Sequence, residues 1–427
     1  MPTPRWERRS CWPRGAVVGL VAGLIAGCAS GPHVPARASV AAVPSAADLD
    51  RIVRALAAET AAIRGLAFTR DVPVQVESPA RMAAHIRREL DSDRGEIETE
   101  RKIGLAMGVL PPGTDLREAL SSLVGTEAQG YYDPGTARLV LSEHDAALLT
   151  APGPEGLDAR ATVVHELVHA LQHQHFAARV EDDDPEAPAL SDASRGRLAL
   201  LEGDATLVAM EWSWRRRGGR LLGAPDMAAR VERWTLNAQV LTEANVPTYV
   251  IDSAEMPYEA GLVGVAALYL AGGFARIDAA IARVSISAAG VMHPEREGAS
   301  AVEVPVSDPA DAALETQGYA RTCARTLGEM ELRLHLGRTM RTERAAALAA
   351  TWRGDRMSLF ERGDTLASRW TIACEDAAHA RGLADAFAPL RERWEREGCP
   401  GLAGGAVRRC PVQVRVEGSL VTIARGG

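Results

Sequence analysis

The sequence predicts an α+β protein that is predominantly helical and ends in a small α+β module. Two observations lead to this fold class. Between Asp48 and Leu336, apolar residues recur mainly every three to four positions, as they do on core-facing helices. Beyond Leu336, two pairs of strand-like segments are each joined by a glycine-containing turn, which is typical of β-hairpins.

The first residues form a signal segment for export. Arginines precede the apolar run Ala16–Ala26, which at about 11 residues is too short to span a bilayer as a mature helix. The run ends in Ile25-Ala26-Gly27-Cys28, which resembles a bacterial lipobox. That resemblance implies cleavage before Cys28 and lipidation of Cys28. An ordinary secretory signal cut elsewhere is the alternative, and both predict an exported protein.

Residues 28–47 are rich in Ala, Pro and Ser and have no apolar period, so we interpret them as a flexible tether. The chain of 427 residues has a formal net charge of −8. Removal of residues 1–27 takes away four Arg and one Glu, which leaves −11. An acidic body of this kind predicts no nucleic-acid partner.

The remaining elements follow from periodicity and turn signals. Before the central motif we expect helices at Asp48–Arg64, Pro79–Leu90 and Glu96–Met107, and strands at Val72–Val76 and Arg138–Leu141. After it we expect helices at Pro257–Leu270, Gly328–Leu336, Thr342–Trp352 and Glu375–Glu397, and hairpins at Arg356–Cys374 and Val412–Ala424. Pro257–Leu270, at about 14 residues, indicates a buried core helix rather than a membrane span. The acidic stretch Glu181–Pro188 reads as a solvated connector.

The central motif is Ala161–Phe176, which contains His165, Glu166 and His169 in H-E-x-x-H spacing. Apolar residues at helical spacing predict an α-helix here, with Asp158 as its N-cap. Residues four apart lie on one helical face, so both imidazoles can bind one Zn²⁺. The adjacent carboxylate of Glu166 can then act as general base toward a zinc-activated water.

A catalytic zinc needs a third protein ligand, and two candidates lie downstream. His175 has the ten-residue spacing at which some zinc enzymes place a third histidine, but these need a helix-breaking glycine where this chain has Gln172. In a continuous helix His175 would lie about 15 Å from His165 along the axis. Glu202 is the better candidate, on a helix capped by Ser191 or Asp192. Gly203 would let this helix approach the first one closely.

The motif His165–Phe176 (HELVHALQHQHF) together with Leu201–Ala205 (LEGDA) resembles exported gluzincin-type bacterial metallopeptidases. Further stretches support the resemblance: Arg64–Phe68, Gly130–Pro134, Pro257-Tyr258 with Gly261, Gly272–Asp278, His293–Glu295 and Trp352–Arg356. It covers most of residues 50–370, and only the zinc motif is highly specific. His173 departs from the acidic residue expected there. The resemblance implies a zincin-like core, in which the strand at Arg138–Leu141 either pairs with an extended substrate or is plain sheet.

Three further residues are candidates for roles around the metal. Asp204 can accept a hydrogen bond from an imidazole N–H, or it can serve in capping or in a salt bridge. Tyr258 and His293 can donate to the oxyanion of a tetrahedral intermediate, although nothing in the local sequence aims them at the metal.

Cysteine usage agrees with an oxidising compartment. Four cysteines remain after Cys11 leaves with the signal and Cys28 is lipidated: Cys323, Cys374, Cys399 and Cys410. Their even number predicts two disulfides, with three possible connectivities. The alternative of a second metal site lacks the usual C-x-x-C spacing.

We therefore expect a zinc metallopeptidase that hydrolyses peptide bonds of a peptide or protein substrate. Cys28 would anchor it to the cell envelope, at the outer membrane, on a face that the sequence leaves open. The alternative is a non-catalytic zinc-binding lipoprotein with a scaffold or binding role. The predicted organisation is a signal at 1–27, a tether at 28–47, an N-terminal subdomain at 48–110, the zincin-like core at 111–317 and the C-terminal module at 318–427.

Overall fold

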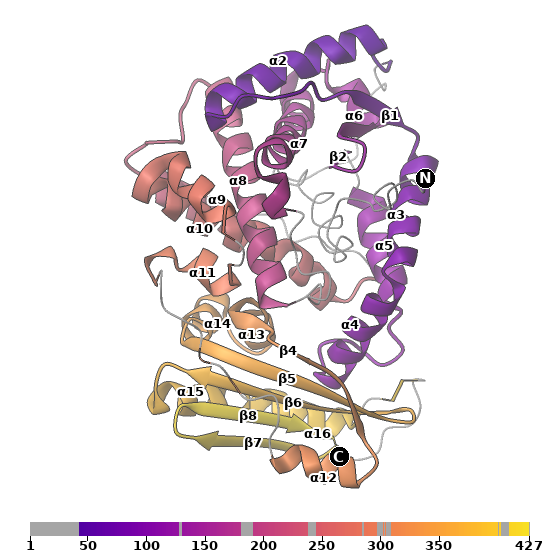
Figure 1. The fold of residues 1–427 in the computed structure, drawn as a ribbon, viewed down its shortest axis with the longest axis vertical. Coiled ribbons are helices and arrows are strands. Elements are labelled where there is room, and N and C mark those ends of the chain that lie inside the picture. The colour runs from indigo at the N-terminus through magenta and orange to yellow at the C-terminus, as the bar shows by residue number, and fades with distance from the viewer. Residues whose placement is uncertain are drawn as a thin grey trace, which may run out of the picture.

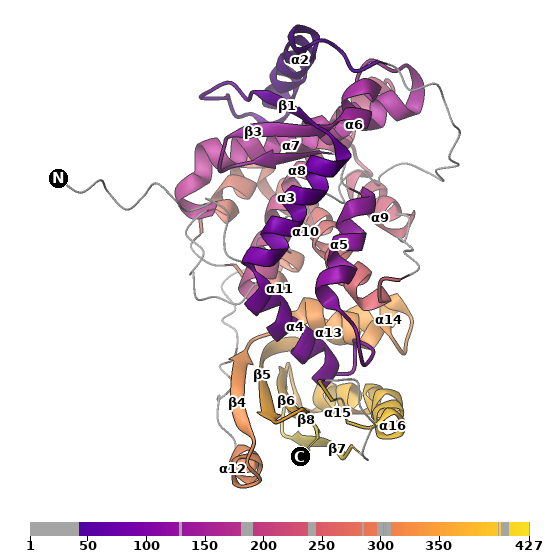
Figure 2. The same cartoon turned by 90° about the vertical axis from the view of Figure 1, so that its right-hand side faces the viewer.

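The computed structural model describes residues 42–127, 130–180, 191–237, 245–283, 286–296, 302, 304, 309–399, 401–402 and 410–426. The fold is α+β and mostly helical, with two separate sheets (Figure 1). Helices α7, α8 and α10 lie at the centre, helix α2 and the smaller sheet at one end, and the larger sheet at the other (Figure 2). The signal segment, Cys28 and Glu181–Pro188 lie outside the described residues.

The elements follow in chain order. The N-terminal part contains α2 (Ala46–Arg64), β1 (Val74–Glu77), α3 (Pro79–Ser92), α4 (Arg94–Ala106), α5 (Leu116–Glu127), β2 (Gly130–Asp133), β3 (Arg138–Ser142) and α6 (Glu143–Leu148). The central part contains α7 (Gly153–Val180), α8 (Asp192–Arg216), α9 (Met227–Asn237), α10 (Thr248–Ile281), α11 (Ala288–Met292) and the 3-10 turn η1 (Pro294–Arg296). The C-terminal part contains α12 (Pro309–Thr316), β4 (Ala320–Arg325), α13 (Gly328–Gly337), α14 (Thr342–Ala349), β5 (Trp352–Arg362), β6 (Thr365–Cys374), α15 (Ala377–Ala386), α16 (Ala388–Glu397), β7 (Val412–Glu417) and β8 (Leu420–Arg425).

The metal-motif helix is longer than the sequence predicts. Helix α7 begins at Gly153, so Asp158 lies inside the helix and the prediction that it is the N-cap is wrong. The helix continues past the motif without a break until Phe176, whose backbone is not helical. Helix α8 does begin as expected, with the Ser191 side chain accepting a hydrogen bond from the Ser194 N–H.

The small sheet has the order β1-β3-β2, with β1 parallel and β2 antiparallel to β3. Strand β3, which carries Arg138–Leu141, is therefore the central strand, and its backbone is paired on both sides. A substrate cannot add to it, so plain sheet is the alternative that holds for this strand. Strand β2 is an edge strand and lies against α7.

Helices α8 and α10 touch through their backbones. A Cβ added at Gly203 would lie 2.4 Å from the carbonyl oxygen of Gly261, and one added at Gly261 would lie 2.0 Å from that of Ala199. The sequence predicts that Gly203 brings α8 close to α7, and this prediction is wrong because Gly203 faces α10. The close contact holds fixed the helix that carries Glu202.

Among the described helices, α10 is the one long and apolar enough to cross a membrane by length and composition. A core helix passes the same test, and α10 packs along α8 with Leu262, Val265 and Ala266 buried. It extends well beyond Pro257–Leu270 at both ends. Its helical backbone breaks at Gly272 and Gly273, and Gly273 has a φ of 66°, which favours glycine.

The C-terminal sheet is antiparallel with the order β4-β5-β6-β8-β7. The two predicted hairpins, β5-β6 and β7-β8, are confirmed. The sequence does not predict strand β4. Trp352 begins β5 rather than ending a helix. The helix expected over Glu375–Glu397 is two helices that meet at Phe387, because Pro389 lacks an N–H and its ring excludes the carbonyl four residues earlier.

Two hydrophobic clusters share the interior, and they cross the expected boundary at residue 110. One contains α2, β3, α7, α8 and most of α10, with Leu167 and Leu207 fully buried. The other joins α3, α4 and α5 to the C-terminal sheet, where Leu105 and Trp370 are members. Arg425 on the last strand donates hydrogen bonds of 3.1 Å to the carbonyls of Leu105 and Ala106 at the end of α4.

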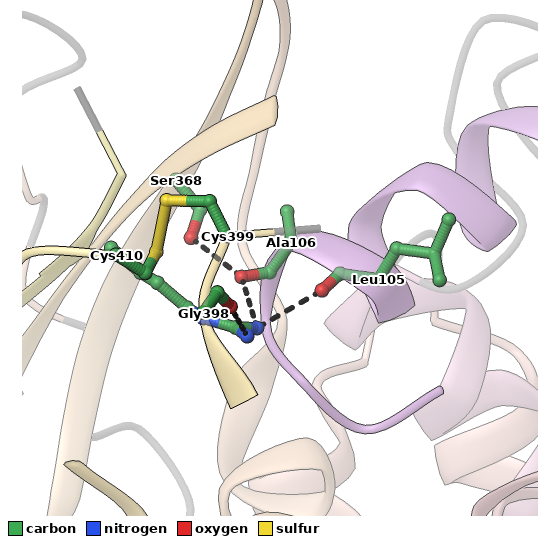
Figure 3. The surroundings of a disulfide bond; sticks show 7 residues. Leu105, Ala106, Ser368, Gly398, Cys399 and Cys410 are labelled. Atoms are coloured by element: carbon green, nitrogen blue, oxygen red, sulfur yellow. Dashed lines mark hydrogen bonds between the residues drawn. A yellow bond between two sulfur atoms is a disulfide. The ribbon is translucent and has the colours of Figure 1, made fainter. Parts of the chain in front are cut away.

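One disulfide, Cys399–Cys410, lies beside this junction (Figure 3). Cys323 and Cys374 are free thiols, so the prediction of two disulfides is wrong for this pair. The two residues lie on β4 and β6, which are separated in the sheet by β5.

The contact between α8 and α10 predicts a large effect of one methyl group. We expect Gly261→Ala to lower the free energy of unfolding by about 1–3 kcal/mol, because its Cβ meets backbone that cannot move aside locally. Gly95→Ala is the matched control, since its Cβ meets nothing within 4 Å on helix α4 and should raise stability by up to about 1 kcal/mol. Urea unfolding of both variants checks this, and equal effects would contradict it.

Candidate metal centre

Three side chains from two helices meet at the centre of the molecule. His165 and His169 lie on α7 and Glu202 on α8, and each is buried. The Nε2 atoms of the two histidines are 3.0 Å apart, and Oε2 of Glu202 lies 3.1 Å from His165 Nε2 and 3.4 Å from His169 Nε2. These residues could hold a metal ion.

The spacing of these atoms suits one small cation. Ligands about 2.0–2.1 Å from a tetrahedral ion stand about 3.3–3.4 Å from one another. The three separations of 3.0, 3.1 and 3.4 Å lie close to that value. Two nitrogens and one carboxylate oxygen form a donor set that zinc accepts, and a catalytic zinc with three protein ligands takes water or substrate as its fourth.

Gln172 fixes which nitrogen of His169 faces the site. Its amide nitrogen donates to the carbonyl of Leu201 and to Oδ2 of Asp204, both at 3.0 Å. Its carbonyl oxygen is therefore the atom that lies 2.9 Å from His169 Nδ1, and Nδ1–H must donate to it. In the neutral imidazole the lone pair is then on Nε2, directed at His165 and Glu202.

Asp204 lies at a crossing of ionic contacts in the interior. Nε of Arg64 is 2.8 and 3.0 Å from its two oxygens, and both side chains are completely buried. Arg64 also pairs with Asp278 through Nη2. Burial alone would lower the pKa of Arg64, but the two carboxylates outweigh it and raise the pKa above its usual value. Asp204 is thus linked to His169 indirectly, through the side chain of Gln172. It also forms a salt bridge with Arg64, which is one of the alternatives that the sequence left open.

The electrostatics of the site favour a bound cation. Burial alone would lower the pKa of His169, but Glu202 raises it to about 9. Burial would likewise raise the pKa of Glu202, but His169 and His165 lower it to about 2. The pKa of His165 is lowered, chiefly by burial. A proton shared within the trio therefore balances the carboxylate charge when no metal ion does so.

Glu166 lies next to the trio and is held by one oxygen. Its Oε2 accepts a 2.8 Å hydrogen bond from the backbone N–H of Tyr132 on the edge strand β2. Its Oε1 is buried and has no hydrogen-bond partner among the described residues. Burial, with a smaller contribution from Glu202, raises the pKa of Glu166 to about 8. Oε1 is thus the oxygen of Glu166 that could exchange a proton with a bound molecule.

The other candidate residues separate into two groups. The ring of Tyr258 lies near that of His165, with centroids 6.3 Å apart. His293 instead bonds Glu329 on α13 through Nε2 at 2.8 Å. His173 contacts the Tyr132 hydroxyl at 2.8 Å, and His175 donates to the carbonyl of Ala67. Neither belongs to the metal trio, as the continuous helix predicts.

Sequence reasoning missed the roles of Gln172, Arg64 and the Tyr132 backbone. Gln172 is three residues after His169, a spacing at which helical side chains meet, so this contact could have been anticipated. Arg64 gave a weaker signal as a charged residue at the end of an amphipathic helix. The partner of Arg64 lies 140 residues away, and nothing local identifies it.

Comparisons with known proteins concern the C-terminal module. A family model described as a domain of unknown function (DUF8575) matches residues 316–427. That segment begins close to the predicted module boundary at 318 and contains the five-stranded sheet. The search of curated proteins finds no match for the chain. The search of solved structures finds none either.

The ligand assignment predicts the outcome of two substitutions. We expect Glu202→Ala to lower zinc affinity by at least about tenfold, because one of three ligand atoms is lost. His175→Ala is the matched control and should leave the affinity unchanged, since the His175 ring donates to the carbonyl of Ala67 and is not among the three metal-ligand residues. Chelator competition on the purified chain measures both. The opposite ranking would make His175 the third ligand.

The raised pKa of Glu166 predicts a pH-dependent stability in the metal-free protein. Below about pH 4.5 this carboxyl is protonated in both the folded and the unfolded chain. Between about pH 4.5 and 8 only the unfolded chain loses the proton, so folding stability falls as pH rises. We expect Glu166→Gln to be more stable than the unaltered chain by a margin that grows over this range. Thermal unfolding with a chelator present measures it, and a margin independent of pH would contradict the expectation.

Proposed function

We propose that this protein is a zinc-dependent metallopeptidase of the gluzincin type that hydrolyses peptide bonds in a peptide or protein substrate. The observation that carries the proposal is the convergence of His165, His169 and Glu202, buried and at spacings that suit zinc, next to Glu166 with one oxygen available. The two histidines on one helix and the glutamate on the next support a zincin-like core.

Within this proposal Glu166 moves the proton. The Tyr132 N–H holds Oε2, which leaves Oε1 to take a proton from the attacking water and to deliver it to the leaving amine nitrogen. When bound, Zn²⁺ supplies Lewis-acid polarisation of the scissile carbonyl and lowers the pKa of water. Tyr258 is the candidate donor to the oxyanion, because its ring lies beside His165. The Glu329 contact of His293 gives that residue no such role.

The location of the enzyme is the second part of the proposal. A lipid on Cys28 would attach the exported chain to the cell envelope, at the outer membrane. Each buried CH₂ adds roughly 0.8 kcal/mol of membrane affinity, so several acyl chains anchor a protein durably. Helix α2 begins at Ala46 and overlaps the last two residues of the expected tether, so the catalytic core would remain close to the membrane surface.

The proposed mechanism predicts that Glu166→Gln lowers the rate of peptide hydrolysis by about 10²–10⁴-fold, the usual contribution of a general base. Removal of zinc by a chelator should abolish the activity, and added Zn²⁺ should restore it. The assay is cleavage of a broad peptide library by the purified mature chain.

The control is the zinc content of the variant. Glu166→Gln should still bind one zinc, because Glu166 is not among the three ligand atoms. Zinc binding by the unaltered chain without cleavage of any peptide would instead favour the alternative of a non-catalytic zinc-binding lipoprotein.

The anchor predicts a defined mature terminus. We expect mass spectrometry of the protein from bacterial membranes to show Cys28 as the first residue, with acyl chains on its thiol and amine. Cys28→Ala should release the protein from the membrane fraction. An unmodified terminus at another residue would make the protein a soluble secreted one.

A further inference from the structure

We propose that Arg64 is a positioning residue for the metal site and that it sets metal affinity through Asp204, Gln172 and His169. The inference rests on the metal centre of the proposed function, and it concerns metal binding rather than hydrolysis. Arg64 is the last residue of α2, and its ion pairs with described residues go to Asp204 and Asp278, neither of which is a metal-ligand residue.

The last link of this chain orients a ligand. Nδ1–H of His169 donates to Gln172, which leaves the Nε2 lone pair for the metal. An imidazole without this partner can rotate or move its proton to Nε2, where it blocks coordination. Loss of such a partner typically weakens metal binding by 10–100-fold.

The middle link holds Gln172 in this orientation. Asp204 accepts from its amide nitrogen, so the carbonyl oxygen must face His169. Asp204 is completely buried, and an ionised carboxylate in that position needs a positive partner. Arg64 is that partner, at 2.8 Å.

The first link is fixed by residues from separate parts of the chain. Arg64 donates to Asp204 on α8 and to Asp278 on the last part of α10, and its guanidinium lies over the Phe274 ring at 4.7 Å. The break of α10 at Gly272 and Gly273 precedes both Phe274 and Asp278. Lysine could not reproduce this arrangement, because an ammonium lacks the planar fork that serves two carboxylates at once.

Segments far apart in the sequence meet at this point. Arg64 ends α2, Asp204 lies on α8 and Asp278 on the last part of α10. The same contacts reach Gln172, whose amide nitrogen donates to Asp204. The guanidinium of Arg64 is thus connected by hydrogen bonds to the residue that orients His169.

The test measures metal binding by the full mature chain. Zn²⁺ affinity is obtained by chelator competition, and Co²⁺ absorption bands report the coordination geometry. We expect Gln172→Met and Arg64→Met each to weaken Zn²⁺ binding by 10–100-fold and to change the Co²⁺ spectrum. Both substitutions interrupt the same series of hydrogen bonds. The double variant should therefore bind Zn²⁺ no more weakly than the single variant with the lower affinity.

Two variants guard against unfolding and unspecific damage. Arg64→Met combined with Asp204→Asn removes both buried charges together, so it should fold. It should still bind Zn²⁺ 10–100-fold more weakly than the unaltered chain, but no more weakly than Asp204→Asn alone, because both changes break the same chain. Arg216→Met is the matched control. It removes an ion pair between α8 and Glu59 on α2 that does not involve Asp204, and it should leave affinity and spectrum unchanged.

The outcomes separate this proposal from the proposed function. If the charge-neutral double variant binds Zn²⁺ as tightly as the unaltered chain, the role of Arg64 is overturned while the metal site stands. Strictly additive losses for Gln172→Met and Arg64→Met would also overturn it. If the unaltered chain binds neither ion, the metal site and the role of Arg64 fail together.

Discussion

Three electron-pair donors directed at one another in a dry interior repel, and this constraint organises the centre of the molecule. Two imidazole nitrogens and a carboxylate oxygen are held within 3.4 Å of one another, and a shared proton or a bound metal ion among them offsets this repulsion. The rest of the centre serves to keep these atoms together. The glycine contact between α8 and α10 fixes the position of Glu202, and the Tyr132 N–H fixes Glu166.

The sequence predicts the local part of this site well. H-E-x-x-H spacing defines a geometry within one helix, because residues four apart share a face whatever surrounds them. The choice of Glu202 over His175 follows from the absence of a helix breaker between Ala170 and Gln174, and α7 is helical there. The hairpins of the C-terminal module are likewise set by short-range turn chemistry, and both are present.

What the sequence does not predict depends on contacts between distant residues. Arg64 and Asp204 recognise each other across 140 positions, and no local pattern identifies the pair. Gly203 shows by its type that a backbone approaches closely, but not that the backbone belongs to α10. The even number of cysteines predicted two disulfides, yet Cys323 and Cys374 are free and lie on strands that β5 separates. The break between α15 and α16 at Phe387 differs from these cases, because Pro389 is a local sequence signal for it.

The shared core of the N-terminal helices and the C-terminal sheet also determines the order in which the molecule can assemble. Helices α3, α4 and α5 are synthesised early, but their apolar faces pack on strands that are synthesised much later. The hydrogen bond from the Ser368 hydroxyl to the carbonyl of Ala106 joins residues 262 positions apart. Contacts of such separation form late and slowly during folding. The apolar surface of the helices at residues 79–127 therefore stays exposed until the end of the chain has been synthesised. Partly folded chains with exposed apolar surface are prone to aggregate.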